Sequence, residues 1–194
     1  ARGTTDVKPE HLGSFEGLAA EVRQTVLGQD AFVDSLVRAM RRPFVLGTEA
    51  PAARNVILLT GGAGTGRHFA LEETARCMAA RGLLQSDRIA TLDLALYPNS
   101  GAEKLFLQDL YAALHAPGEI LAFEHYESCY PGFLKTLSDL AVKGSAPLSS
   151  RYLVNKEGIL VDAGTALAPG AVSSITPCGK YLIFFSRKGR DALA

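Results

Sequence analysis

The sequence lacks the features that mark several classes of protein. It has no tryptophan, and its three cysteines, Cys77, Cys129 and Cys178, are widely spaced and form no C-x-x-C pair, so no zinc or dithiol site is indicated. No apolar run reaches the roughly 20 residues of a membrane helix, and no secretion signal opens the chain. Basic and acidic residues number 20 each, which favours neither nucleic acid nor an anionic membrane as partner. We expect a cytoplasmic protein, and the start without methionine suggests that the natural protein is longer.

The remaining composition predicts one globular α/β domain. Of the 194 residues, 47% are hydrophobic and 21% are charged, which suffices for a real core. Helical and strand periodicities alternate along the chain, and such alternation builds a mostly parallel sheet with helices on both faces. We therefore predict a three-layer αβα sandwich, with residues 1–17 as an extension and residues 18–194 as the domain. The predicted helices span 18–24, 30–42, 67–81, 102–114 and 131–142; the strands span 56–59, 89–94, 119–124 and 181–185, and a β-hairpin spans 152–162.

A glycine-rich loop follows the strand 56–59, which we expect to be central in the sheet. Such a loop between a strand and a helix brings backbone N–H groups and a helix N-terminus together, the geometry that binds phosphate. In the pattern G-x-x-x-x-G-K-[ST] the two glycines match, but arginine stands for the lysine and histidine for the hydroxyl residue. The candidate binding residues here are Gly61, Gly62, Ala63, Gly64, Thr65, Gly66, Arg67 and His68. In the helix that follows, Phe69, Leu71, Ala75 and Met78 are expected to face the core.

The two substitutions change the chemistry available to this loop. Arg67 keeps a positive charge but is larger than a lysine ammonium. His68 offers no hydroxyl, so the usual protein ligand of Mg²⁺ is absent and hydrolysis should suffer most. The motif alone leaves open a second interpretation, in which the loop is only a tight turn without a ligand. Cationic residues at a helix N-terminus oppose the helix dipole, which favours a bound anion.

Further segments resemble the Clp ATPase family of AAA+ proteins, in that family's own order. Val26, Leu27, Gly28 and Gln29 resemble the V-x-G-Q element that packs beside adenine, and the hairpin at 152–162 resembles L-T-D-S-Q-G-R-T-V-D. Phe123, Glu124 and His125 stand where the family has F-D-E, and Arg187 stands at the sensor asparagine. In this register Glu124 takes the metal position and His125 the place of the catalytic base. A slip of one residue makes Glu124 the base, so one carboxylate is lost in either register.

The resemblance implies a large AAA+ subdomain of the P-loop NTPase class, with ATP or ADP as cofactor, other protein subunits as partners and a hexameric ring. It leaves Mg²⁺ binding and enzymatic activity undecided. The segment 98–118 lacks the family's pore loop, and the helical lid is absent from this chain. His125, Tyr126, Cys129 and Tyr130 are expected to form a connection and not a metal site.

Two hypotheses follow from the resemblance. The first is a degenerate Clp-type nucleotide-binding domain that serves as a structural or assembly module, with weak or no ATP hydrolysis. The second is a divergent but active Clp-type ATPase that acts as a chaperone or unfoldase. Loss of the base, of the Mg²⁺ hydroxyl and of the sensor together favours the first.

Overall fold

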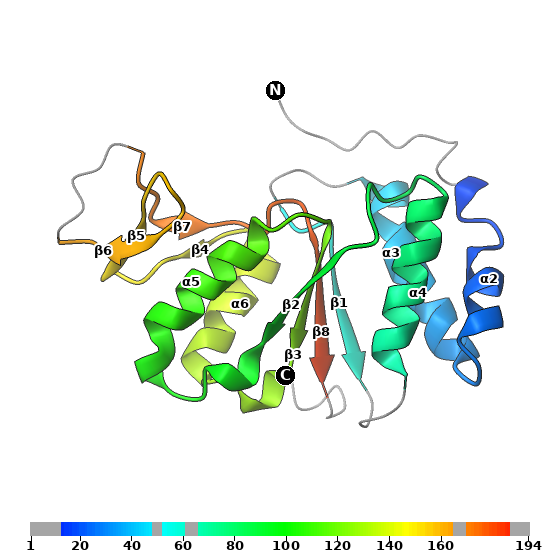
Figure 1. The fold of residues 1–194 in the computed structure, drawn as a ribbon, viewed down its shortest axis with the longest axis horizontal. Helices are drawn as coiled ribbons and strands as arrows, with labels where there is room; N and C mark the ends of the chain where they lie inside the picture. Colours follow the sequence, from blue (N-terminus) through cyan, green and yellow to red (C-terminus); the bar gives the residue numbers. More distant parts are fainter. Residues whose placement is uncertain (1–12, 48–51, 61–65, 165–169, 187–194) are drawn as a thin grey trace.

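The core of the protein is a four-stranded parallel sheet, seen in a computed structural model that describes residues 13–47, 52–60, 66–164 and 170–186. The strand order is β1-β8-β3-β2, and every neighbouring pair is parallel. The carboxyl ends of all four strands therefore lie at one edge of the sheet (Figure 1). The strands span Asn55–Thr60 (β1), Ile89–Asp93 (β2), Ile120–Glu124 (β3) and Tyr181–Ser186 (β8).

Helices cover both faces of this sheet, which confirms the predicted three layers (Figure 1). Alternate residues of β8 enter opposite cores, because successive side chains of a strand point to opposite faces: Tyr181, Ile183 and Phe185 pack on one side, and Leu182 and Phe184 on the other. The first core is formed with α2 (Leu18–Thr25), α3 (Asp30–Leu46) and α4 (Arg67–Ala80). The second is formed with α5 (Glu103–Leu114) and α6 (Pro131–Lys143).

Helix α3 runs four residues past its predicted end at Arg42, straight through Pro43. A proline inside a helix leaves the carbonyl four residues earlier without its backbone donor. Here that carbonyl belongs to Ala39, and the side-chain amide of Asn55 donates to it at 2.8 Å. The first residue of β1 thus satisfies the group that Pro43 leaves open, and the helix continues.

Two expectations about the glycine-loop region are wrong. Within the described residues β1 is an edge strand of the sheet, and β8 and β3 occupy its centre. Phe69 is 45% exposed, because the inward face of α4 is formed by other residues of this helix. The buried residues of α4 are Ala70, Leu71, Thr74, Ala75, Cys77 and Met78.

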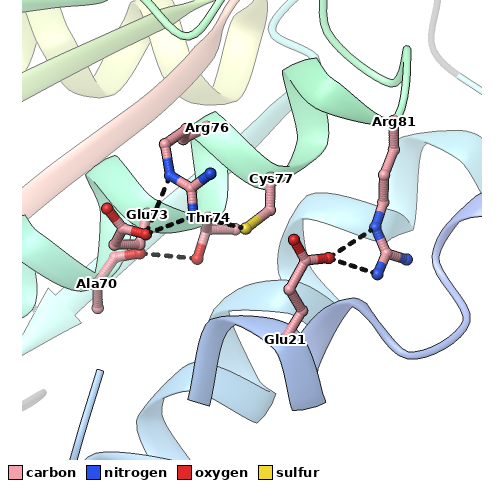
Figure 2. A network of polar contacts seen from close by, with 7 residues as sticks. All are labelled: Glu21, Ala70, Glu73, Thr74, Arg76, Cys77 and Arg81. Carbon is pink, nitrogen blue, oxygen red and sulfur yellow. Dashed lines mark hydrogen bonds and ion pairs between the residues drawn. The ribbon is translucent and has the colours of Figure 1, made fainter. Parts of the chain in front are cut away.

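An arginine just past α4, Arg81, connects this helix to α2 and to the residues that precede α2. Arg81 forms an ion pair with Glu21 of α2 at 2.7 Å, and Figure 2 shows the two side chains meeting between the helices. Its guanidinium also donates to the carbonyls of Ser14 and Glu16, each at 2.8 Å. The hydrogen bonds from Arg81 lower the pKa of Glu21. The end of the predicted extension is therefore attached to the domain.

Short elements complete the fold beside α5 and α6. The predicted hairpin is confirmed as the antiparallel pair β5 (Tyr152–Val154) and β6 (Leu160–Asp162). A second antiparallel pair, β4 (Ala146–Pro147) with β7 (Ser174–Ile175), was not predicted. In the described ranges, no helix is both long and apolar enough to cross a membrane. Short 3-10 helices span Leu94–Leu96 (η1), Ser100–Ala102 (η2) and Tyr126–Ser128 (η3).

Candidate functional site

The candidate site lies at the carboxyl edge of the sheet, where β1 passes into α4. Gly61, Gly62, Ala63, Gly64 and Thr65 lie outside the described residues. Gly66 precedes α4 with a φ of 76°, and a Cβ there would meet no atom within 4 Å. Glycine is therefore favoured at position 66 by the backbone conformation and not by lack of space. The predicted strand before the glycine segment and the predicted helix after it are both confirmed, as β1 and α4.

Arg67, at the lysine position of the motif, is engaged by the ends of two strands. Its Nη1 donates to the carbonyl of Leu59 in β1 and to the carbonyl of Ser186 in β8, each at 2.7 Å. The guanidinium carbon also lies 5.6 Å from the centre of the Phe185 ring, within cation–π range. The positive charge at the start of α4 is thus held by carbonyl oxygens and an aromatic face of the protein itself.

His68 packs on the same aromatic ring and faces a carboxylate. Its imidazole stacks on Phe185 with 3.9 Å between ring centroids and 12° between planes. Its Nε2 lies 3.4 Å from Oε1 of Glu124, the last residue of β3. The residue at the hydroxyl position of the motif is therefore paired with Glu124, which stands at the metal position in one register and at the base position in the other.

His125 forms a separate pair with Asp93, at the carboxyl end of β2. Nδ1 of His125 lies 2.7 Å from Oδ1 of Asp93. The hydrogen bond from His125 lowers the pKa of Asp93, and the backbone N–H of Ala95, which donates to the same oxygen at 3.0 Å, acts in the same direction. His125 has a φ of 55°, an uncommon conformation for a residue with a side chain. The strained backbone turns His125 toward β2, away from the line of β3.

A buried serine at the end of β8 contacts both Arg67 and the segment that follows β3. The hydroxyl of Ser186 donates to the carboxylate of Glu127 in η3, and Ser186 is fully buried. The carbonyl of Ser186 is the one that accepts from Arg67. The last residue of β8 therefore links the arginine of the motif to the connection that follows β3.

The structure brings together some of the predicted residues and separates others. Arg67, His68 and Glu124 meet around Phe185, whereas His125 pairs elsewhere. Leu27, Gly28 and Gln29 form the α2–α3 connection, which lies at the same end of the molecule as the strand ends (Figure 1). Arg187 lies outside the described residues.

Sequence reasoning missed the partners of these residues. Phe185 was assigned only to the end of a predicted strand, and no contact was predicted for Ser186 or Glu127. The register of β8 beside β1, which pairs Thr60 with Ser186, is what places them under Arg67. The position of Ser186 directly before Arg187, at the sensor position, could have indicated that Ser186 lies near the site. Its contacts could not be predicted, because they depend on strand order.

The side chains at the metal position do not fit Mg²⁺. Hard cations prefer several oxygen ligands, whereas Glu124 offers one carboxylate beside an imidazole. Across residues 13–47, 52–60, 66–164 and 170–186, no cluster of three or more histidine, cysteine, aspartate or glutamate side chains is placed to hold a metal ion. What the arrangement provides is a basic and aromatic edge with one carboxylate paired to each of its two histidines.

Comparisons with known proteins assign no family. The sequence matches no protein-family model, and no curated protein matches it significantly. The firm assignment is therefore an α/β protein with a parallel sheet of order β1-β8-β3-β2 between helical layers.

Proposed function

We propose that this chain is a degenerate AAA+ nucleotide-binding domain of Clp type that serves as a structural or assembly module, without efficient ATP hydrolysis. The serial resemblance of its motifs supports the family, and the parallel sheet with helices on both faces is compatible with it. ATP or ADP is the proposed ligand, and further protein subunits, six in a ring by resemblance, are the proposed partners. The compartment we propose is the cytoplasm, supported by free thiols at all three cysteines.

The observation that carries the proposal is the internal pairing of the two altered motif residues. Arg67 donates to two strand-end carbonyls, and His68 stacks on Phe185 beside Glu124. A P-loop lysine acts by contacting the β- and γ-phosphates, and the following hydroxyl acts by binding Mg²⁺. Side chains that are anchored to the protein in this way stabilise the fold and contribute little to phosphoryl transfer.

Nucleotide binding then depends on the backbone of the glycine segment and on the start of α4. Backbone N–H groups at a helix N-terminus attract phosphate without help from a side chain. Leu27, which is 81% exposed in the α2–α3 connection, offers an apolar surface at the same end for a base. We therefore expect binding that is modest and independent of Mg²⁺.

The test is calorimetric titration of ATP into the protein with and without Mg²⁺, combined with phosphate release from the full-length protein. Binding that is equal in both conditions, with phosphate release at background, supports the proposal. Turnover that requires Mg²⁺ would show an active ATPase. A repaired variant, Arg67→Lys with His68→Thr, serves as the matched comparison and should gain Mg²⁺-dependent affinity.

A second candidate, a divergent active ATPase, is favoured by one pair of residues. Asp93 holds Nδ1 of His125 at 2.7 Å, and a carboxylate that orients an imidazole is the arrangement of a general base. If His125 activates water, Asp93→Asn should lower the rate of phosphate release by at least tenfold, on the order of the effect expected for a general base. If release stays at background in both proteins, the pair is structural.

A further inference from the structure

A cysteine occupies a turn position that normally belongs to asparagine or glycine, at the edge of the sheet opposite the candidate nucleotide site. In the turn before β8, Lys180 N–H donates to the carbonyl of Pro177 at 3.1 Å. The two central residues, Cys178 and Gly179, have φ values of 55° and 71°. Two positive φ angles define a turn in which asparagine and glycine are strongly preferred. A residue held in such a conformation is a candidate for a functional role.

The turn presents the Cys178 thiol to a histidine from another element. Sγ of Cys178 lies 3.8 Å from Nε2 of His115, which immediately follows α5, and the thiol also donates to the carbonyl of Thr176 in its own turn at 3.5 Å. The two segments are neighbours because β3 and β8 are parallel, with Ile120 opposite Tyr181. Cys178 is exposed, so an incoming reagent reaches the sulfur, whereas Cys77 and Cys129 are buried.

The hydrogen bond of Nδ1 determines the tautomer of His115, and therefore whether Nε2 faces the thiol with a lone pair. Nδ1 lies 2.9 Å from the carbonyl oxygen of Tyr111. A carbonyl only accepts, so Nδ1 carries the proton and Nε2 of the neutral ring is the acceptor. The ring also stacks on the Tyr111 side chain with centroids 4.1 Å apart. The imidazole is therefore oriented as a base for the thiol, at the carbonyl end of a helix, where a positive charge is favoured.

A buried ammonium holds the turn beside this histidine. Lys180 is 5% exposed, and its Nζ donates to the carbonyls of Ala116 and Gly118, each at 2.6 Å. Burial lowers the pKa of Lys180, and its electrostatic interactions with Cys178 and Glu119 oppose that shift. The charged or titratable groups around this region include His115, Tyr111, Lys180, Glu119 and Arg54, which pairs with Glu119 at 3.7 Å.

We propose that Cys178 and His115 form a reactive thiol site that exchanges with low-molecular-weight disulfides. Nε2 of His115 takes the thiol proton, and the thiolate of Cys178 attacks one sulfur of the small disulfide. The disulfide bond breaks as the bond to Cys178 forms, and the departing thiolate takes the proton from His115. One protein thiol and one small disulfide thus give one mixed disulfide and one small thiol, with no further oxidant. A second exchange with the small thiol reverses the modification.

The first experiment measures mixed-disulfide formation by intact mass on the full chain with glutathione disulfide at pH 7. The addition of one glutathione is expected, mapped to Cys178 and absent from Cys178→Ser, with Cys77 and Cys129 as internal controls. The same thiol in the urea-unfolded chain should react about tenfold more slowly, because His115 no longer lies beside the sulfur to accept its proton. Equal or faster reaction at Cys178 in the unfolded chain overturns the proposal.

The second experiment separates a proton-accepting histidine from a merely structural one. His115→Asn keeps a donor for the Tyr111 carbonyl and removes the acceptor that faces sulfur. The variant should react about tenfold more slowly at pH 7 and as fast as the original protein near pH 10, where an ordinary thiol is already ionised. His115→Gln provides a second variant if folding, checked by circular dichroism, is impaired. Rates that are equal at pH 7, or that differ by the same factor at both pH values, contradict the role of His115.

Discussion

Replacement of Arg67 by alanine tests whether the altered motif residue has become a structural anchor. The side chain donates to the carbonyls of Leu59 and Ser186 at 2.7 Å, and both residues are at least 95% buried. A hydrogen bond from a charged donor contributes about 1.5–3 kcal/mol. The cation–π contact with Phe185 adds about 0.5–1 kcal/mol at a partly exposed site. Because the guanidinium is partly solvated, we count only the lower limit for the two hydrogen bonds and expect a loss of about 3 kcal/mol.

The control for this loss is Arg76→Ala on the same helix. Arg76 is 53% exposed in its side chain and pairs with Glu73 at 2.8 Å. An exposed ion pair within one helix is screened by solvent and contributes little to stability. The comparison therefore separates the anchoring contacts from the general effect of removing a cation from α4.

The assays are urea unfolding and thermal unfolding, each followed by far-ultraviolet circular dichroism, which suits a chain without tryptophan. Arg67→Ala should lower the thermal midpoint by about 6–12 °C, since about 1 kcal/mol corresponds to about 2–4 °C in a domain of this size. The stability of Arg67→Lys should lie between those of Arg67→Ala and Arg76→Ala, because a lysine ammonium is still a hydrogen-bond donor but lacks the planar, forked geometry of the guanidinium. If the free energies of unfolding of Arg67→Ala and Arg76→Ala differed by less than about 1 kcal/mol, the anchoring role of Arg67 would be refuted.

Two further predictions concern the scaffold. Gly118→Ala should destabilise the protein by about 2–4 kcal/mol, because the φ of Gly118 is 101° and a Cβ there would lie 2.8 Å from the carbonyl oxygen of Arg88. The control is Gly179→Ala, which should cost only about 1 kcal/mol, because Gly179 has a φ of 71° but open space around a Cβ. Equal urea midpoints for the two variants would contradict the predicted clash at Gly118. The pKa of Glu21 is lowered, so its pair with Arg81 stabilises the fold at neutral pH and is lost as the pH falls through the range below 4.5. Glu21→Gln should therefore melt below the original protein at pH 7 and at the same temperature near pH 2, and a constant difference would exclude this linkage.

The fold was predictable because local signals and tertiary structure agree along most of the chain. The hairpin turn shows this agreement: Oδ1 of Asn155 accepts from the N–H groups of Glu157 and Ile159, as the turn composition indicates. Helix α6 ends at Gly144, whose φ of 75° suits a glycine after a helix. Each of these signals lies within a few residues of its effect.

The failures arise where a distant residue decides the outcome. The end of α3 depends on Asn55, which is 16 positions from the carbonyl that it satisfies. The edge position of β1 depends on strand order, which the alternation of elements does not specify. The pair of β4 and β7 rests on two residues in each strand, too few for a period-two pattern to be detected.

The candidate site follows the same division between residues and partners. Motif and resemblance identified Arg67, His68, Glu124 and His125, but their partners come from β8 and β2, far along the chain. The pairing of Asp93 with His125 depends on β2 lying beside β3 in a register that places Asp93 opposite Glu124. Sequence reasoning therefore identified which residues had changed and missed what they contact.

The contacts around Phe185 make the altered motif residues one coupled unit. Arg67 and His68 both contact this ring, and His68 also faces Glu124. Substitutions that share a partner are generally not additive, with coupling of about 0.5–3 kcal/mol. A double-mutant cycle of Arg67→Lys and His68→Thr should therefore show coupling above about 0.5 kcal/mol in urea unfolding, whereas Arg67→Lys with Glu21→Gln, on separate contacts, should be additive. Additivity in both cycles would mean that the two motif positions changed independently, and the internally paired edge would then not explain why both differ from the P-loop pattern.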